Sequence, residues 1–344
     1  MENKRTSKLG VSNVTGFFEK NILLVVLLAL VVSMAFINTN FLTGKNLINI
    51  LRNMAVNGIL ACGFTMLLVA GEFDLSFGST LGLTCCLIPL MSERFAGTAL
   101  GMTGGALIGM LIALVVAICV GLINAYFVIR WHLPAMLVTL AMQFAVYGVA
   151  GILTGGTPQY VLPKWFGFFG KGMVASTIPI SVVIFLVLMV IFYVLLQHTK
   201  YGRTVYVVGG NAEAARLSGI NTAKFKVGAY VVMQVTAFLA GVIFCSQLAG
   251  GVPSYGKGIE FNVIAGVIIG GASMVGGMGN MKNTFIGLLF LNVIMNAMTI
   301  ANVSEYWQYA VRAIIMILAL MLSEAQRIWT NSRKIKAVQT LQGQ

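Results

Sequence analysis

The polar side chains that could carry chemistry lie on single faces of otherwise apolar segments. Thr139, Gln143 and Tyr147 follow one another at four-residue spacing, and Asn292 and Asn296 repeat that spacing in a later segment. Side chains four residues apart share one face of a helix, so each set predicts a polar stripe. Weak hydroxyl and amide hydrogen bonds suit a small polar solute that must bind and leave again. The alternative is interhelical hydrogen bonding, worth about 0.6 kcal/mol for each bond.

Asp74 is the only aspartate in the chain and closely follows Glu72. Carboxylates inside a membrane are costly and often functional. Asp74 also lies at the junction of two apolar runs, where a side chain of this type caps helices. We favour the capping role over a functional one.

Signatures of enzyme chemistry are nearly absent from the sequence. The two histidines, His132 and His198, lie near the ends of apolar runs, and no HExxH, GxSxG or DxD motif occurs. Residues 251–258 nearly match the phosphate-binding loop G-x4-G-K-S/T, but Gly258 lacks the hydroxyl that holds magnesium. The five cysteines form no CxxC pair, which argues against a zinc site or a disulfide framework. We expect no enzyme activity, no bound cofactor and no metal in this chain.

The elements that must position these side chains are membrane-spanning helices. The chain has 344 residues, of which 58% are hydrophobic and 9% are charged, and its mean hydropathy is +0.92. A soluble domain carries about 25% charged residues. Too few polar side chains remain to cover a globule, which excludes a soluble enzyme, a nucleic-acid-binding module and a disordered chain. We predict an all-α polytopic membrane protein with a single transmembrane domain over residues 1–344.

Charge-free windows of about 20 residues predict ten transmembrane helices. The windows are residues 21–44, 53–71, 75–92, 105–129, 134–153, 172–199, 227–256, 261–281, 283–304 and 306–323. The last window contains Arg312, which we expect to extend to the outer surface.

The positive charges orient these helices. With both termini in the cytoplasm, 15 Lys and Arg residues lie inside and 6 lie outside, which agrees with the positive-inside rule. The net charge of +13 is then explained by the basic residues of the cytoplasmic segments and does not indicate a nucleic-acid partner. This arrangement places an N-terminal tail (1–20), a loop (200–226) and a C-terminal tail (327–344) in the cytoplasm.

Two segments of the sequence resemble each other. Residues 72–82 and 260–270 both read E-F-D/N-x3-G-x3-G. In the ten-helix arrangement they lie five helices apart, and an odd offset inverts the orientation. The match predicts an inverted repeat of two five-helix halves. Alternatively, the same spacing of small residues only allows helices to pack closely in lipid.

The loop at residues 200–226 contains the signals of a short helix over residues 212–218. Asn211 is a good N-cap, and Gly219 suits a C-cap. An acidic residue in the first turn and a basic one in the last match the helix dipole. Two helical turns are unstable alone in water, so we expect tertiary contacts or a partner, with an ordinary structured loop as the alternative. The candidate residues are Asn211, Ala212, Glu213, Ala214, Ala215, Arg216, Leu217 and Gly219.

This loop resembles the cytoplasmic coupling loop of the ribose/xylose-type ABC transporter permeases. Further segments resemble that family in the same order along the chain. GEFDLSFGS at residues 71–79 is similar to G-G-I-D-L-S-V-G-S, GLINA at 121–125 to G-L-x-N-G, LPAMLVTL at 133–140 to L-P-x-F-I-x-T-L, and GGASMVGGMG at 270–279 to G-G-x-S-x-x-G-G-x-G. The chain departs from these patterns where Glu72 and Ala125 replace glycines and where Phe73 and Phe77 replace aliphatic residues.

The resemblance implies the membrane-spanning permease subunit of an ATP-driven importer of a monosaccharide, such as a ribose-like pentose, a hexose or a related polyol. It implies a location in the cell (inner) membrane and three partners. These are a cytoplasmic ATP-binding-cassette ATPase, an extracytoplasmic sugar-binding protein and a second permease copy or paralogue. The candidate residues of the translocation path or gate are Asp74, Ser76, Asn124, Thr139, Gln143, Tyr147, Asn292 and Asn296.

Two other classes of function are weighed against this one. A self-sufficient secondary transporter or channel for a small polar solute would use buried titratable residues for ion coupling, and Glu72 and Asp74 are its candidates. A membrane-embedded enzyme would need a catalytic cluster of His, Asp or Glu, which the sequence does not provide.

Overall fold

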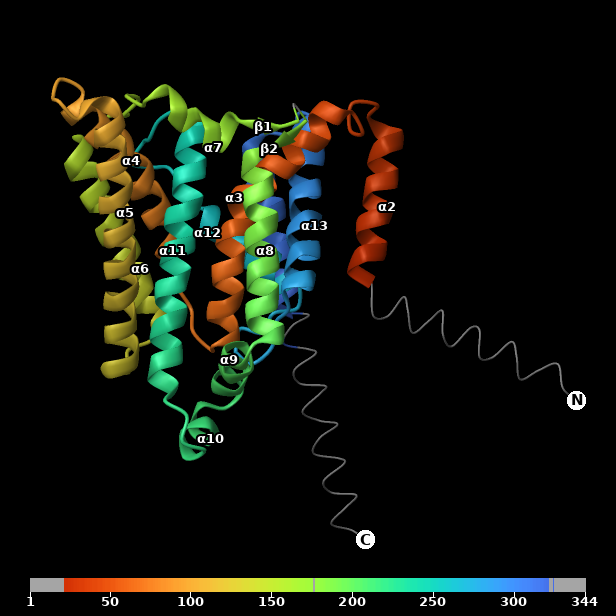
Figure 1. Cartoon of the computed structure of the whole chain (residues 1–344). Helices are drawn as coiled ribbons and strands as arrows, with labels where there is room; N and C mark the ends of the chain where they lie inside the picture. The colour runs from red at the N-terminus through yellow and green to blue at the C-terminus, as the bar shows by residue number, and fades with distance from the viewer. Residues whose placement is uncertain (1–21, 176, 322–323, 325–344) are drawn as a thin grey trace, which may run out of the picture.

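The computed structural model describes residues 22–175, 177–321 and 324, and both predicted tails (1–20 and 327–344) lie outside the described residues. The chain forms a bundle of helices (Figure 1). The elements are α2 (Ile22–Ile37), α3 (Gly44–Val69), α4 (Phe77–Phe95), α5 (Gly101–Ala125), the π-turn η1 (Tyr126–Arg130), α6 (Ala135–Thr154), the 3-10 turn η2 (Lys164–Phe166), α7 (Gly167–Lys171), β1 (Met173–Val174), β2 (Ile178–Pro179), α8 (Ile180–His198), α9 (Lys200–Gly210), α10 (Ala212–Leu217), α11 (Thr222–Leu248), α12 (Ile259–Ile269) and α13 (Met281–Ile300). A terminal helix follows at residues 305–321.

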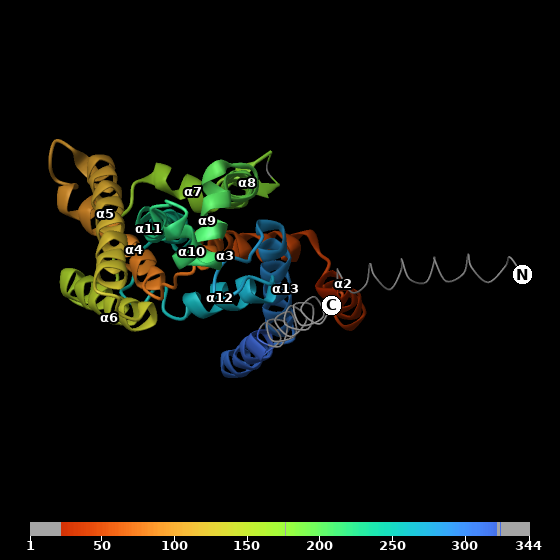
Figure 2. The ribbon, with the colours of Figure 1, turned by 90° about the horizontal axis from the view of Figure 1, so that it is seen from below.

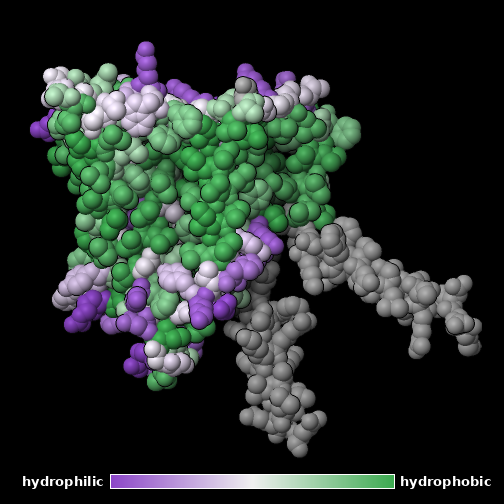
Figure 3. All heavy atoms as spheres, viewed as in Figure 1, coloured by the Kyte–Doolittle hydropathy of each residue, from purple (hydrophilic) through white to green (hydrophobic). Residues whose placement is uncertain are grey.

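Six helices in the described part of the chain are long and apolar enough to cross a membrane. They are α3, α5 continued through η1, α6, α8, α11 and α13. Figure 3 shows that hydrophobic residues cover the middle of one face and that hydrophilic residues gather toward its two ends. The prediction of an all-α polytopic membrane protein is confirmed.

The core of the bundle is built around α3 and α11. Figure 2 shows these two helices between α5 and α6 on one side and α13 and α2 on the other. Glycines allow close approach at the helix crossings. A Cβ added at Gly63 of α3 would overlap Thr236 Oγ1 of α11, and one added at Gly241 would lie 2.7 Å from Thr84 Cβ of α4. A real Cβ does not tolerate either distance, so both crossings require glycine.

The chain does not leave the bundle where α11 ends. Residues 249–258 are irregular and run along α4, with Gly251 against the Cys85 carbonyl and Gly256 against the Gly78 carbonyl. Non-helical backbone at membrane depth is tolerated only where protein or a water-filled cavity surrounds it. The predicted windows 227–256 and 261–281 are therefore wrong in extent, because α11 ends at Leu248 and α12 has 11 residues.

The two ends of the bundle carry different short elements. Helices α9 and α10 lie at one end, and α7 with the β1–β2 hairpin lies at the other (Figure 1). The sequence analysis did not predict α9. That helix buries Gly202, Val205 and Val208 and packs on α3, α8 and α11.

The two copies of the E-F-D/N motif have different local structures. Glu72 lies in the irregular linker before α4, whereas Glu260 lies in the first turn of α12. The sequence match therefore does not pair equivalent positions of the fold.

Candidate functional site

A buried polar cluster occupies the linker between α3 and α4. Asp74 and Ser76 are both fully buried. Oδ1 of Asp74 accepts hydrogen bonds from the Ser76 backbone N (2.7 Å) and the Ser76 hydroxyl (2.6 Å). Its Oδ2 accepts from Gln234 Nε2 of α11 (2.7 Å) and from Asn124 Nδ2 of α5 (3.3 Å). The fold thus brings together three of the predicted path or gate residues and adds Gln234.

Asp74 does not cap α4. The N-cap residue of that helix is Ser76, which makes no side-chain cap bond, and Asp74 bonds to Ser76 instead of to an amide of the first turn. The capping role favoured from the sequence is therefore wrong. The carboxylate instead joins the linker to α5 and α11.

Glu72 is held by the same helix as Asp74. Its Oε1 accepts from Lys226 Nζ at 2.7 Å, and its Oε2 accepts from Tyr230 OH at 2.9 Å. Lys226, Tyr230 and Gln234 follow at four-residue spacing and so form one face of α11. These three side chains hold the linker in place. The sequence analysis did not identify them as site residues, because their acidic partners lie far away in the sequence.

A second polar group joins α6 to α12. Gln143 Nε2 donates to Glu260 Oε1 at 2.7 Å, and Glu260 is 2% exposed. Lys257 Nζ lies 5.8 Å from the centre of the Tyr147 ring, which is within the range of a cation–π contact. Gln143 and Tyr147 therefore flank the start of α12, whereas Thr139 donates only to the Ala135 carbonyl of its own helix.

The predicted polar stripe on α13 serves packing in the structure. Asn296 and Asn46 of α3 exchange two side-chain hydrogen bonds, at 2.8 and 2.9 Å. Asn292 Nδ2 donates to the Leu288 carbonyl one turn earlier. The Asn296–Asn46 pair corresponds to the interhelical alternative for the stripe, whereas the Asn292 bond stays within α13.

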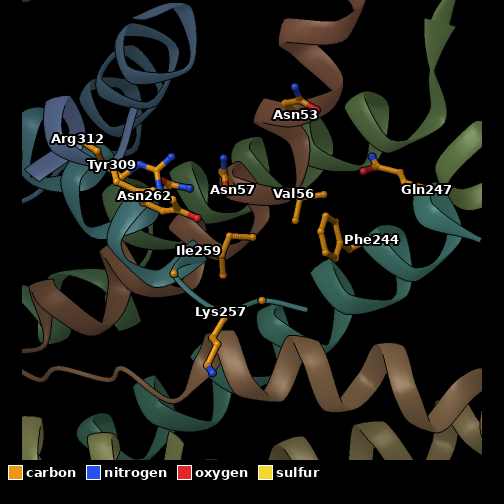
Figure 4. Close-up of a pocket in the computed structure, with 12 residues that line it drawn as sticks. Asn53, Val56, Asn57, Phe244, Gln247, Lys257, Ile259, Asn262, Tyr309 and Arg312 are labelled. Carbon is orange, nitrogen blue, oxygen red and sulfur yellow. The ribbon is translucent and has the colours of Figure 1, made fainter. Parts of the chain in front are cut away.

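A cavity of about 330 Å³ lies between α3, the end of α11, the start of α12 and the terminal helix (Figure 4). None of the eight predicted path or gate residues lines it. Arg312 does line it, and whether this side chain extends to the outer surface stays a prediction. The lining residues are Asn53, Val56, Asn57, Phe244, Gln247, Gly256, Lys257, Gly258, Ile259, Asn262, Tyr309 and Arg312.

The short helix predicted in the 200–226 loop is confirmed as α10. Asn211 Oδ1 accepts from the Ala214 N at 2.9 Å, and Gly219 has φ +80° just after the helix. Arg216 and Glu213 form an ion pair at 2.7 Å, and the guanidinium holds the pKa of the Glu213 carboxyl below its usual range. Leu217 is 76% exposed at the tip of the bundle, an apolar side chain available to a partner.

The end of α9 connects α10 to the polar linker. A Cβ added at Gly209 would overlap the Val69 carbonyl at the end of α3, and one added at Gly276 would lie 2.7 Å from Gly71 Cα. The Gly277 N also donates to the Val69 carbonyl at 3.0 Å. Three backbone segments thus meet without side chains between them, at residues 69–71, directly before Glu72.

Within the part of the chain that the structure describes, no three His, Cys, Asp or Glu side chains lie close enough to hold a metal ion. The polar groups are instead suited to hydrogen bonding. Together, the membrane-spanning helices, the buried polar linker and the capped helix beyond the bundle define a multi-pass membrane protein.

The comparisons with known proteins identify the family. Residues 46–320 match the model of the family described as "Branched-chain amino acid transport system / permease component". The chain is 33% identical to the Ribose import permease protein RbsC of Escherichia coli (strain K12) over 88% of its own length and 93% of that protein. It is 30% identical to the L-arabinose ABC transporter permease protein AraH of Azospirillum brasilense, over 91% and 90% of the two chains. It is 28% identical to the Xylose transport system permease protein XylH of E. coli (strain K12), over 83% and 86%.

The chain therefore belongs to this family of permeases, in its ribose/xylose-type ABC sugar branch. The resemblance stated from the sequence motifs is confirmed. Proteins of this kind are transport subunits and not enzymes. No solved structure matches the chain.

Proposed function

We propose that this chain is the membrane-spanning subunit of an ATP-driven importer that moves a monosaccharide across the cell (inner) membrane. The relatives named for ribose, L-arabinose and xylose support a sugar substrate. The structural observation that carries the proposal is α10, a capped helix with an exposed Leu217 that extends beyond the bundle. A separate ATPase chain would bind this helix, and ATP binding there would move the helices attached to it.

The proposal includes ten transmembrane helices in two inverted halves, with both termini in the cytoplasm. In this arrangement α3, α4 and α5 correspond to α11, α12 and α13. The packing supports the correspondence, since α3 contacts α12 and α13 whereas α11 contacts α4 and α5. The irregular segments at 70–76 and 249–258 would then be equivalent breaks, as in inverted-repeat transporters.

The assembled importer would contain a second permease copy or paralogue, the ATPase and an extracytoplasmic sugar-binding protein. Asp74, Ser76 and Asn124 would form a gate, because they fix the linker that the end of α9 contacts. Gln143 and Tyr147 would border the path beside α12.

Reconstitution into liposomes tests the proposal. The permease, a partner ATPase and a partner sugar-binding protein should together take up a labelled pentose or hexose only when ATP is supplied on the α10 side. The permease alone should take up nothing. Uptake by the permease alone, driven by a proton or sodium gradient, would instead establish the secondary-transporter alternative.

Thiol labelling tests the orientation. Cys119 is exposed, so the experiment starts from Cys119→Ser. In intact cells, Lys164→Cys and Lys257→Cys should react with an impermeant thiol reagent, whereas Glu213→Cys should not. Labelling of the Glu213→Cys variant from outside would overturn the proposed orientation.

A further inference from the structure

An apolar groove of about 930 Å³, the α5–α11 groove, lies between the end of α5, the turn η1 and the start of α11. Helix α11 packs along α5 and η1, and these elements reach the end of the bundle at which α10 lies (Figure 1). The wall that α11 provides consists of Ala223 and Val227, whose small side chains leave the space open. Among the described residues that line the groove, Arg130 is the one charged side chain, and the other eight are apolar or aromatic.

The groove lies within the depth of the membrane and reaches the membrane surface. Helix α5 continued through η1 is a candidate membrane span over Gly101–Arg130, so Arg130 is the last residue of that span. Tyr126 is 54% exposed and Trp131 is 62% exposed, and aromatic side chains of this kind gather at the membrane–water interface. Leu122 and Arg130 lie about 12 Å apart along a helix axis, and the hydrocarbon of one leaflet is about 15 Å thick. The groove therefore extends from the lipid tails to the headgroups.

The walls of the groove favour a hydrocarbon occupant. A water-soluble ligand would lose its hydration there, and side chains such as Leu122, Phe127 and Val227 offer no hydrogen bond in return. Apolar cavities in proteins stay dry for the same reason. Leu122 and Phe127 are also exposed on the surface of a membrane-spanning helix, so they face the bilayer. An acyl chain of a neighbouring lipid can enter from that side and fill the groove.

Arg130 provides an unpaired positive charge at the headgroup end of the groove. Its side chain is exposed, and within the described part of the chain the ion pairs are Glu213–Arg216 and Glu72–Lys226. No side-chain hydrogen bond or ring contact joins Arg130 to another described residue. A guanidinium donates two parallel hydrogen bonds to a phosphate group, which makes arginine well suited to phosphate recognition. The charge therefore favours a lipid whose headgroup carries a phosphate.

A second apolar groove shows what distinguishes this one. It has a volume of about 390 Å³, lies between α8 and α13, and is lined by Lys282. The Lys282 ammonium already lies 4.9 Å from the centre of the Tyr193 ring, within the range of a cation–π contact. Arg130 has no such contact, and the exposed Lys224 follows Ala223 in the first turn of α11. A zwitterionic headgroup would bring its own cation next to these positive charges, whereas an anionic headgroup would not.

We propose that the α5–α11 groove binds an anionic phospholipid of the leaflet on the α10 side, with an acyl chain along Tyr126 and Val227 and the phosphate at Arg130. In the proposed orientation this is the cytoplasmic leaflet, and basic pockets between helices on that side bind anionic headgroups. The lipid would contact the first turn of α11, directly after Asn221, whose side chain caps that helix. The site goes beyond the proposed function and does not depend on the solute that is moved.

Quenching of Trp131 fluorescence tests the site, because this side chain directly follows Arg130. Trp165→Phe, Trp307→Phe and Trp329→Phe leave Trp131 as the only tryptophan of the full chain. The protein is reconstituted into phosphatidylcholine vesicles that contain increasing fractions of phosphatidylglycerol or phosphatidylcholine with brominated acyl chains. Half-maximal quenching should require an about fivefold lower fraction of the brominated phosphatidylglycerol, as expected for one basic side chain near anionic headgroups.

Variants separate the site from a general effect of surface charge. Arg130→Met should remove the preference for phosphatidylglycerol, and Arg130→Lys should keep most of it. The matched control is Lys200→Met, which removes one exposed positive charge at the same end of the bundle, outside the groove. Loss of the preference in Lys200→Met as well would overturn the site. Equal half-maximal fractions of the two lipids in the parental chain would overturn the anionic assignment, and no quenching by either lipid would show that another protein surface covers the groove.

Two further measurements test the acyl chain and the source of the phosphate. Ala223 is exposed, so Ala223→Phe should fill the groove without disturbing the core, and it should raise the half-maximal fraction of phosphatidylglycerol to that of phosphatidylcholine. An unchanged preference in this variant would overturn the groove as the binding site. Excess soluble glycerol phosphate should not alter the quenching by the parental chain. Displacement of the lipid by glycerol phosphate would instead identify a site for a free phosphate compound and overturn the assignment to a lipid.

Discussion

Lys226 Nζ lies 2.7 Å from Glu72 Oε1, although the two residues are 154 positions apart in the sequence. The Glu72 side chain is 6% exposed and that of Lys226 is 22% exposed, so the pair is largely removed from water. Removal of one partner from a buried ion pair is far more costly than removal of both.

We expect Lys226→Met to destabilise the protein by about 2–4 kcal/mol, a range lowered for the partial exposure of the lysine. The variant leaves the Glu72 charge without its ion-pair partner beside the linker. The double variant Lys226→Met with Glu72→Gln should recover most of the loss. Thermal unfolding in detergent, followed by size-exclusion chromatography, measures both. Equal melting temperatures for the single and double variants would contradict this account of the pair.

Asp74→Asn should abolish most transport, because the new amide would face donors from Gln234 and Asn124. If Gln234 is also changed to Glu, the new carboxylate on α11 can accept a hydrogen bond from the new amide at residue 74. We therefore expect Asp74→Asn with Gln234→Glu to regain a substantial part of the uptake in proteoliposomes. An inactive double variant that folds normally would show that the carboxylate is needed at residue 74 itself and not only as a hydrogen-bond acceptor.

The contact at the end of α9 predicts different outcomes at two adjacent glycines. Gly209→Ala would overlap the Val69 carbonyl, whereas a Cβ at Gly210 would meet nothing closer than Gly277 Cα at 4.0 Å. Overpacking of this kind costs about 1–3 kcal/mol. Gly209→Ala should lower ATP-driven uptake at least tenfold with the ATPase still bound, and Gly210→Ala should transport normally. Equal uptake by the two variants would exclude this contact as the route from α10 to the linker.

Gly219, two residues after the end of α10, provides a fourth prediction. Gly219 has φ +80° and open space around it, so only backbone strain opposes a side chain there. Gly219→Val should strain the end of α10 and weaken binding of the ATPase, whereas Gly219→Asn should be nearly neutral, because asparagine tolerates left-handed backbone. Pull-down of the ATPase with each variant measures the difference. Normal binding and transport by Gly219→Val would favour the alternative in which residues 212–218 belong to an ordinary structured loop that binds no partner.

The sequence predicted α10 correctly because its determinants are local. Asn211, Glu213, Arg216 and Gly219 each act within one turn of the helix, so no tertiary information was required. Helix α9 was missed because its stability is tertiary. Its sequence, KYGRTVYVVGG, contains three glycines, and it is helical where Val205 and Val208 are buried against neighbouring helices.

The break after α11 was missed for another reason. Charge-free windows measure hydropathy and not backbone conformation, so residues 249–256 counted as part of a helix. The signals were present in Gly250, Gly251, Pro253 and Gly256. Pairings between distant helices, such as Asn46 with Asn296, could not be predicted, because a polar stripe does not identify its partner.

The bonds between the α3–α4 linker and α11 also constrain how the protein is made. Glu72 and Asp74 emerge from the ribosome about 150 residues before Lys226, Tyr230 and Gln234. Protein synthesis adds about 5–20 residues per second, so the α11 side chains that bond to these two carboxylates are made on the order of ten seconds later. During that interval the first helices are inserted without a completed linker. A nascent chain that stops before α11 carries Glu72 without Lys226 and Tyr230, and Asp74 without Gln234, a feature by which quality-control proteases could distinguish it from the finished subunit.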